Sequence, residues 1–332
     1  MNEKERLIRA LKGEKVDRPP VICPGGMMNA AVTEVVLGLD KNHNNSLEGM
    51  VLAAKKVREL TGFENYGVPF CMTCEAEPLG VEVDLGDKNC EPRVVEYNKS
   101  DIDSIMKSYN VNPLTDGRMA LVIAAIKELK NDDIPVIGNI TGPLSTATSI
   151  VDPLLLIKML RKNPEQAYNF INFVNDYLIE YAKLMLQAGA DVIAISDPTA
   201  TGEILGRKNF EQFALPMYKK MIAAVHSLDK PIIIHICGDS KNIVESLNTL
   251  NADALSFDSI VNMRFARSKI STRLMGNVST QLLQDGPIER IISITQNCID
   301  SGVDILSPAC GLSMATPVCN LKAMIDYEKG RV

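Results

Sequence analysis

Short apolar runs rich in β-branched residues alternate with amphipathic stretches along the whole chain, and this alternation constrains the fold more than any other feature. Runs such as PVIGNI, VIAIS and IIIHI are apolar at nearly every position, which is typical of parallel strands buried on both faces. The pattern predicts eight strands, at residues 20–23, 66–70, 135–140, 191–196, 231–236, 252–257, 273–278 and 304–307.

Helical patterns lie between these runs, for example at residues 163–188, 212–226 and 288–301. A strand followed by a helix and a small polar turn is the repeating βα unit. No Gly/Pro/Ser-rich linker interrupts the repeat, and no G-x-G-x-x-G motif follows the first strand, so a closed barrel is favoured over an open doubly wound sheet. We therefore predict one domain over residues 1–332, a single (β/α)8 TIM barrel with an N-terminal helix. A hairpin excursion is expected near residues 75–112, where VEVDL and RVVEY alternate.

Composition and charge exclude several classes of function. The net charge is −6 and the chain has no tryptophan, which argues against nucleic acid or an anionic membrane as a partner. The first residues, MNEKERLIRALKGEK, have no apolar stretch of signal-peptide length, and no run is long enough to span a membrane. We therefore expect a cytoplasmic protein. Its eight cysteines are then expected to be buried groups, metal ligands or reactive thiols rather than a disulfide framework.

A histidine and two cysteines lie where predicted strands end. His235 and Cys237 are two positions apart, so on an extended strand they point to the same face, and Cys310 follows the eighth strand. Barrel active sites form at this end of the strands. Two thiolates and an imidazole suit zinc, and three protein ligands with one open position are typical of a catalytic zinc. The alternative is that all three are buried strand residues. A non-catalytic metal-binding barrel would instead hold zinc with four protein ligands.

Other polar residues at predicted strand ends are candidates for the same site. Asp258 follows the strand next to the His/Cys strand, so it is either a displaceable fourth ligand or a hydrogen-bond acceptor or helix cap. Asp197 precedes a proline and either faces substrate or caps its loop, and Asn277 is expected to bind substrate. Cys71 and Cys74 form a C-M-T-C sequence without a strand leading directly into a helix. We therefore interpret this pair as structural rather than as a redox motif, and its role stays open.

With these residues in place, the chain resembles the uroporphyrinogen decarboxylase superfamily, and within it the cobamide-dependent methyltransferase branch. The resemblance runs nearly end to end, through ERLIRALKGEKVDRPPV, PFCMTCEAEPLGVEVDLGD, SISDPTATGEIL, HICGDS, MGNVST and SPACGLSMATPVCNLKAM. Its most specific part is the zinc signature His-x-Cys with a distant Cys, which matches His235, Cys237 and Cys310. In that branch an acidic residue can complete the zinc sphere, and that position falls on Asp258.

The resemblance implies methyl transfer between a methylcobamide and a zinc-activated thiol such as coenzyme M. For this site we expect Asp258 and Asp197 to assist catalysis, and Met72, Glu75 and Asn277 to contact the substrate. A corrinoid-binding domain normally offers D-x-H-x-x-G, but Ile233 stands in place of the aspartate before His235. The corrinoid is therefore expected on a separate partner protein. A demethylase that passes a methyl group from an O-, N- or S-methyl substrate to a cobalt(I) corrinoid remains an alternative.

The chain departs from true uroporphyrinogen decarboxylases in two places. Their arginine-rich motif after the first strand is replaced by CPGGMM, and their catalytic aspartate has no clear match in MTCEAEPLG. A substrate with many carboxylates would require that arginine cluster. We therefore predict that the chain does not decarboxylate porphyrinogens.

Overall fold

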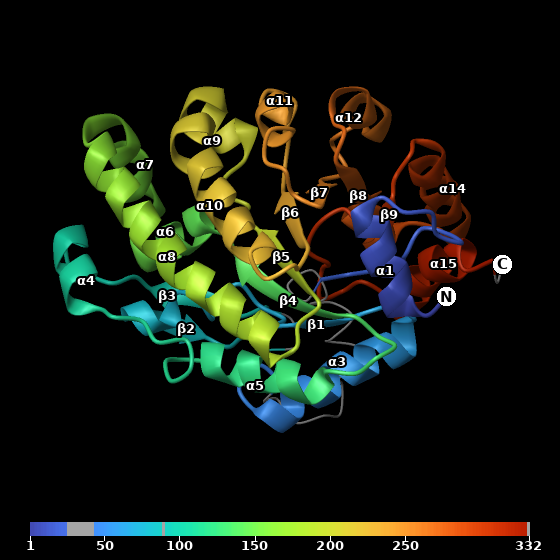
Figure 1. The fold of residues 1–332 in the computed structure, drawn as a ribbon, viewed down its shortest axis with the longest axis horizontal. Helices are drawn as coiled ribbons and strands as arrows, with labels where there is room; N and C mark the ends of the chain where they lie inside the picture. Colours follow the sequence, from blue (N-terminus) through green and yellow to red (C-terminus); the bar gives the residue numbers. More distant parts are fainter. Residues whose placement is uncertain (25–42, 88–89, 331–332) are drawn as a thin grey trace.

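The computed structural model, which describes residues 1–24, 43–87 and 90–330, contains a parallel sheet that curls around a central axis with helices outside it (Figure 1). The strands follow one another around the sheet in chain order, apart from an inserted hairpin. They are β1 Tyr66–Val68, β4 Val136–Thr141, β5 Val192–Ser196, β6 Ile232–Ile236, β7 Ala254–Phe257, β8 Arg273–Val278 and β9 Ile305–Pro308. The predicted α/β fold with a curled parallel sheet is confirmed.

Residues 20–23 take the eighth strand position between β9 and β1, but form a single bridge, Val21 with Leu306, rather than a regular strand. Pro20 has no N–H, so it can only accept, and it accepts a hydrogen bond from the Leu306 amide at 3.0 Å. On the other side, the Glu64 N–H donates to the Val21 carbonyl at 2.9 Å, and at Cys23 the side chain of Asn65 takes the place of a neighbouring backbone. Its amide oxygen accepts from the Cys23 N–H at 3.0 Å, and its amide nitrogen donates to the Cys23 carbonyl at 3.0 Å. The segment thus joins the two edges of the sheet.

The amphipathic stretches form helices that pack on the outer face of the sheet (Figure 1). The longest, α8, begins after Asn163 with a proline in its first turn and ends at Gly189, which has φ 122°. The segment predicted as one helix at 212–226 is divided into a π-helical turn, Phe210–Ala214, and α10. The helices are α1 Glu3–Lys12, α3 Leu47–Thr61, α5 Met119–Leu129, α6 Pro143–Ile150, α7 Pro153–Lys162, α8 Pro164–Ala188, α9 Gly202–Asn209, α10 Leu215–His226, α11 Val244–Leu247, α12 Met263–Lys269, α13 Thr280–Asp285, α14 Ile288–Asp300 and α15 Val318–Glu328.

Side-chain alternation along the strands divides the core into two layers. On β6, Ile232 and Ile234 belong to the outer layer against the helices, whereas Ile233 belongs to an inner cluster within the curl of the sheet. Helix α1 packs Leu7 and Leu11 into this inner cluster, against residues near the beginnings of the strands. Apolar packing thus fills the N-terminal end of the barrel, while polar side chains occupy the strand ends opposite.

The predicted hairpin near residues 75–112 is present. Strands β2 Glu82–Asp84 and β3 Arg93–Glu96 pair antiparallel, and a short 3-10 helix, Glu77–Leu79, precedes them. Helix α4, Ile102–Ser108, follows and begins at Asp101, whose side chain accepts from the Ser104 N–H at 2.9 Å.

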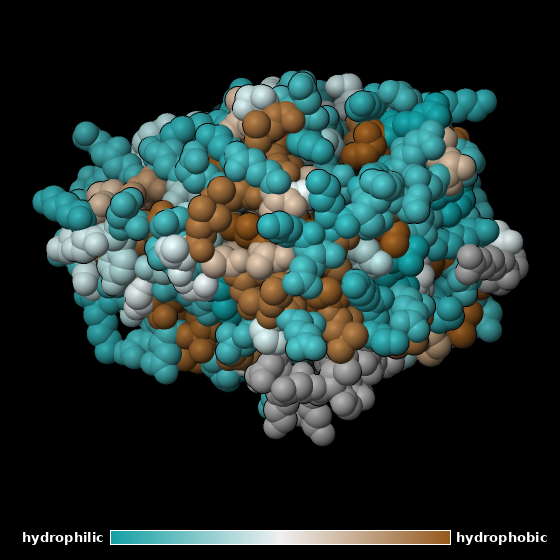
Figure 2. Space-filling view, turned by 60° about the horizontal axis from the view of Figure 1, so that its bottom comes forward, coloured by the Kyte–Doolittle hydropathy of each residue, from teal (hydrophilic) through white to brown (hydrophobic). Residues whose placement is uncertain are grey.

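Hydrophilic side chains cover most of the face shown in Figure 2, with apolar side chains gathered near its middle. Within the described ranges, no single helix has the length and apolar composition needed to cross a membrane. The sharply bent pair α6 and α7 meets that criterion only when taken together.

Candidate metal centre

Strand β6 positions the histidine of the predicted site. His235 follows the inward-facing Ile233 by two residues, so alternation directs its side chain into the barrel, where it is 3% exposed. Its Nδ1 lies 2.9 Å from the Oγ of Ser256, on the neighbouring strand β7. Its Nε2 lies 3.1 Å from the Sγ of Cys237, directly beyond the end of β6. The serine therefore occupies one ring nitrogen and leaves the other facing the thiols.

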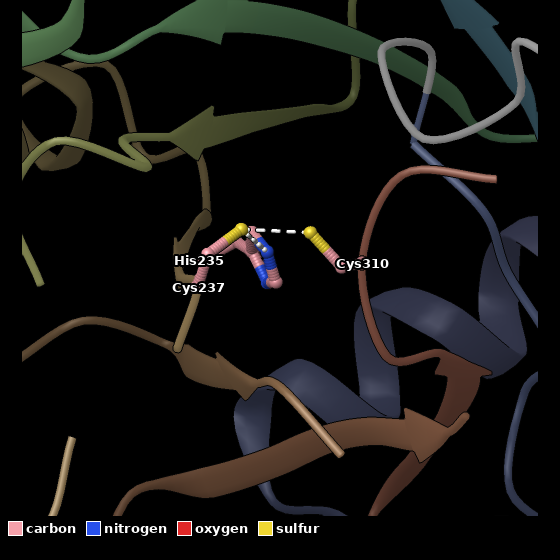
Figure 3. A group of neighbouring side chains, drawn as sticks. All are labelled: His235, Cys237 and Cys310. Carbon is pink, nitrogen blue, oxygen red and sulfur yellow. Dashed lines mark hydrogen bonds between the residues drawn. The ribbon is translucent and has the colours of Figure 1, made fainter. Parts of the chain in front are cut away.

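The second cysteine comes from the other side of the barrel. Cys310 follows β9, and its Sγ lies 2.7 Å from the Sγ of Cys237 (Figure 3). One ligand atom from each of these cysteines and from His235 lies within 4.8 Å of the others. Among the described residues, no other group of three His, Cys, Asp or Glu side chains converges in this way. The three residues singled out from the sequence therefore come together.

The two thiols are joined by a hydrogen bond. This hydrogen bond, together with His235, lowers the pKa of the Cys310 thiol. The same hydrogen bond and burial raise the pKa of Cys237 well above its usual range. A cation placed between the two sulfurs would favour the deprotonated form of both thiols.

A cavity of about 360 Å³ opens over these three side chains. Met72 lines it, at the position where a substrate contact was expected. Apolar atoms of Leu312 and Pro198 form another part of its wall. The polar part of the wall comes from Glu91, Ser196, Thr280, Gln281, Gln284 and Ser313.

Asp258 lies beside the candidate metal ligands but outside the converging group. Its Oδ2 accepts from the N–H of Gly238, the residue after Cys237, at 3.2 Å. Its Oδ1 accepts from the Ile260 N–H at 3.1 Å, which stabilises the turn after β7. The carboxylate thus holds the loop that carries Cys237. A role as displaceable zinc ligand stays a prediction.

Asn277 lies outside the cavity over the metal ligands, because its side chain is used to hold the loop after β7. Its amide nitrogen donates to the carbonyls of Asp258 and Val261, at 2.9 and 2.8 Å. It lines a different cavity, together with Arg264 and Cys298. This placement favours a structural role over the predicted contact with substrate.

Asp197 also differs from its predicted orientation. Ser196 takes the inward position at the end of β5, so the next side chain points outward, where it is fully buried. The Asp197 carboxylate accepts from the N–H groups of Leu144 and Ser145, from the Ser145 hydroxyl and from Tyr218. Burial raises its pKa, although these hydrogen bonds lower it in part. Asp197 therefore stabilises the start of α6, and the predicted assistance to catalysis has no support in its placement.

Glu75 is buried and is not among the residues that line the cavity. Its carboxylate is 1% exposed and accepts from the Thr141 N–H at 2.8 Å and the Thr141 hydroxyl at 3.0 Å. Burial raises the pKa of Glu75 to about 7. The predicted contact with substrate does not fit this position, since Glu75 joins the loop after β1 to the end of β4.

Cys71 and Cys74 form a buried cluster with Arg118. Their sulfurs lie 3.6 Å apart, and both side chains are at most 1% exposed. The Arg118 guanidinium donates to Cys71 at 3.3 Å and to Thr73 at 2.6 Å, and it pairs with Glu77 at 2.8 Å. The thiol of Cys74 and then Arg118 lower the pKa of Cys71. The cluster fixes the loop that carries Met72 over the metal ligands.

The sequence analysis missed Ser256 and the pair of glutamines in the cavity wall. The inward direction of the Ser256 side chain could have been predicted from strand alternation. Ser256 stands two residues after the inward-facing Ala254, on the strand next to His235. Gln281 and Gln284 have no comparable signal, since their place in the wall depends on how α13 follows β8.

The donor set fits a zinc ion. Two sulfurs and one imidazole nitrogen converge, and the other imidazole nitrogen is held by Ser256, the arrangement that orients metal-bound histidines. The three ligands come from two strand ends at the open end of the barrel, and the cavity leaves access to a fourth position. Such a site suits a metal that binds an exogenous ligand.

The chain is similar to known proteins over nearly its whole length. The family model described as Uroporphyrinogen decarboxylase (URO-D) matches residues 2–330. The methylcobamide:CoM methyltransferase MtbA of Methanosarcina acetivorans is 32% identical, with 98% of this chain and 97% of that protein covered. The methylcobamide:CoM methyltransferase MtaA of Methanosarcina barkeri is 31% identical, with 97% and 96% covered. The structure of a methyltransferase from Methanosarcina mazei superposes with a TM-score of 0.90, at 30% identity, and covers 99% of both chains.

Proposed function

Because the chain belongs to the uroporphyrinogen decarboxylase family and is 31–32% identical to methylcobamide:CoM methyltransferases, we propose that it is a zinc-dependent corrinoid methyltransferase. It would move a methyl group between a methylcobamide carried by a partner protein and a small thiol. The family match over residues 2–330 also supports a single barrel domain for the whole chain.

The observation that carries this proposal is the convergence of His235, Cys237 and Cys310 under an open cavity. These three residues would hold zinc. When bound, zinc lowers the pKa of a thiol ligand so that it is held as the thiolate, the nucleophile that methyl transfer requires. Two anionic cysteines and a neutral imidazole balance the charge of a divalent cation. An incoming thiolate therefore keeps much of its negative charge, and with it its nucleophilicity.

The side chains around the ligands bind and orient rather than react. Ser256 accepts or donates at Nδ1 of His235 and so keeps Nε2 directed at the metal position. Met72 and Leu312 form apolar wall next to the ligands, which limits the water that surrounds a bound thiolate. Asp258 restrains the backbone at Gly238 and hence the direction of the Cys237 side chain.

The corrinoid is proposed to come from a separate protein that docks over the cavity. The sequence most similar to the corrinoid motif D-x-H-x-x-G is His235-x-x-Gly238. The two ring nitrogens of His235 face Ser256 and Cys237. Ile233 is buried in the inner core where that motif needs an aspartate. The chain's own histidine is therefore committed to the metal centre, and a corrinoid would have to be bound elsewhere.

A demethylation assay tests the proposal. Methylcobalamin is incubated with the zinc-loaded protein and a small thiol, and cobalt(I) formation is followed by absorbance under anaerobic conditions. We expect thiol-dependent formation of cobalt(I) that is lost in the Cys237→Ala variant. Turnover of methylated substrates with cobalt(I) corrinoid, but none with thiols, would favour the demethylase direction instead.

A further inference from the structure

A second cavity, which we call the α12–α14 cavity, shares none of its described lining residues with the cavity over the candidate metal ligands. Its volume is about 520 Å³, within the range of small-molecule sites. Its described wall comes from the segment after β7 and the start of α12, from the segment after β8, and from one face of α14. On α14 the lining residues recur at helical spacing, as Arg290, Ile294, Asn297 and Ser301. A whole helix face therefore borders this space.

Two arginines of this wall have no carboxylate partner. Neither Arg264 nor Arg290 makes an ion pair or a hydrogen bond with any described residue. Arg267, one turn further along α12, pairs with Asp304 and donates to the Gly302 carbonyl at 2.9 Å. The two guanidinium groups in the cavity thus keep their N–H donors for a ligand, whereas Arg267, which does not line the cavity, is used by the fold.

The positions of these two arginines do not stabilise their helices. Arg264 is the second residue of α12, and Arg290 is the third residue of α14. The first turn is the positive end of the helix dipole, where an acidic side chain is stabilising and a cation is not. The other cations of α12, Arg267 and Lys269, lie in its last turn, where the dipole favours them. A bound anion explains the placement of Arg264 and Arg290 better than helix stability does.

Side chains that cap two helices add neutral donors to the same wall. The Asn262 Oδ1 accepts from the Phe265 N–H at 3.0 Å, so the amide nitrogen of Asn262 is left for a ligand. The Ser279 Oγ accepts from the Leu282 N–H at 3.3 Å, so the hydroxyl hydrogen of Ser279 is left as well. Leu282 and Ile294 give the wall an apolar part. This combination fits a ligand with an anionic head and an apolar body.

We propose that the α12–α14 cavity binds a small organic anion, with a carboxylate or phosphate head at Arg264 and Arg290 and an apolar body against Leu282 and Ile294. Arginine binds both kinds of head through two parallel N–H···O hydrogen bonds. The site is distinct from the candidate metal centre, so this inference does not depend on the proposed function.

Three anions and one uncharged analogue provide the test: phenyl phosphate, phenylacetate, inorganic phosphate and benzyl alcohol. Binding to the zinc-loaded protein is measured by isothermal titration calorimetry at fixed ionic strength. We expect one site per chain for the two aryl anions, weaker binding of inorganic phosphate because it lacks the apolar body, and no saturable binding of benzyl alcohol. The ratio of phenyl phosphate to phenylacetate affinity distinguishes a phosphate head from a carboxylate head. The same site should persist in Cys237→Ala, because the metal is not its ligand.

Substitution of the two arginines should weaken binding. Arg264→Gln and Arg290→Gln remove the charge and keep a polar side chain. We expect the double variant to bind phenyl phosphate at least about tenfold more weakly, a ratio that corresponds to about 1.4 kcal/mol, and each single variant to show a smaller loss. Ile294→Ala should weaken the binding of phenyl phosphate more than that of inorganic phosphate, because it removes apolar contact only.

Arg161→Gln is the matched control for the single arginine variants. Arg161 lies in the last turn of α7, is exposed, lacks an ion pair with any described residue and does not line the α12–α14 cavity. The control removes the same charge from the surface and should leave the affinity for phenyl phosphate unchanged. Circular dichroism and zinc content check that each variant is folded, which we expect because Arg264 and Arg290 are exposed.

The inference would be overturned if neither aryl anion binds at a site that persists in Cys237→Ala. Equal affinity for phenyl phosphate in the double arginine variant and in the unmodified protein would overturn it as well. An equal loss in Arg161→Gln and in the single variants would show that net charge attracts the anion, and that the cavity does not. None of these outcomes bears on methyl transfer to a thiol.

Discussion

The Nδ1 of His235 and the Oγ of Ser256 lie 2.9 Å apart across two neighbouring strands, both within the buried interior of the barrel. This contact holds the imidazole in one orientation. We expect Ser256→Ala to weaken zinc binding by about 10- to 100-fold, the usual effect of removing a partner that orients a metal-bound histidine. Zinc affinity is measured by competition with a chromophoric chelator.

Ser307→Ala serves as the control for this change. Ser307 is equally buried at the end of β9, but its hydroxyl donates to the Pro308 carbonyl in its own strand. Equal zinc affinity in Ser256→Ala and in the unmodified protein would show that the contact does not orient the ligand.

Zinc content should depend on both cysteines of the centre. We expect about one zinc per chain, and loss of most of it in Cys237→Ala and in Cys310→Ala, because two protein ligands rarely retain zinc. Elemental analysis of dialysed protein measures this. Cys319→Ala, which removes an exposed thiol, should keep the metal. Full retention of zinc in both ligand variants would falsify the site.

Asp258 should influence thiol affinity more than zinc affinity. It restrains Gly238 rather than joining the converging ligand atoms, so Asp258→Asn should retain zinc and change the affinity for thiol. Thiol binding should release about one proton per site near pH 7, because the thiol enters as the thiolate. Zinc-edge X-ray absorption with and without thiol should show one additional sulfur. An unchanged sulfur count with a turnover-competent thiol would contradict direct binding to the metal.

Porphyrinogen decarboxylation should be absent despite the family. CPGGMM replaces the arginine-rich motif, and within the described residues no arginine lines the cavity over the metal ligands. Incubation with uroporphyrinogen should return it unchanged, as followed by chromatography of the oxidised products. Coproporphyrinogen formed at enzyme-like rates would show that another set of residues binds the carboxylates.

The free energy of unfolding should decrease as the pH rises from 4.5 to about 7, because of the buried carboxyl group of Glu75. Burial raises the pKa of Glu75 from 4.5 to about 7, so between these values the folded protein keeps a proton that the unfolded chain has released. The stabilisation is complete below pH 4.5 and is lost as the pH rises through 7. Relative to Glu75→Gln, which imitates the protonated acid, the free energy of unfolding should fall by about 3 kcal/mol over this window, at about 1.4 kcal/mol per pH unit. Denaturant titrations at several pH values measure it, and parallel pH profiles for the two proteins would contradict it.

The strands were predictable because each one is a continuous apolar run between helical patterns, and seven of the eight predicted positions are regular strands. The first predicted strand, residues 20–23, is not regular, because prolines lie at its start and directly after it. Pro20 lacks an N–H, and Pro24 follows Cys23, so a regular ladder is not possible. That Asn65 would complete the pairing through its side chain could not be inferred, because this depends on how two distant segments meet.

The site was predictable to the extent that strand alternation determines it. His235 and Cys237 are two apart, so their common direction follows from the sequence, and Cys310 shares the same end of the barrel. The same alternation explains why Asp197 differs. It stands one position beyond the inward Ser196, so its side chain turns to α6. The contacts of the Gln281 and Gln284 side chains could not be predicted from the sequence. Both donate to Asp285, and these contacts depend on how α13 packs.

The pairing of Val21 with β9 also affects when the metal centre can form during folding. Cys310 follows Cys237 by 73 positions, and β7 and β8 lie between their strands, so the sulfurs meet only when the sheet is curved. A nascent chain that ends before Cys310 holds two of the three ligands. Tight zinc binding would therefore be confined to chains in which the ring of strands has formed, and zinc would stabilise that state by mass action. Chelation during refolding should accordingly slow or reverse closure of the last βα unit, while the first strands to pair would be unaffected.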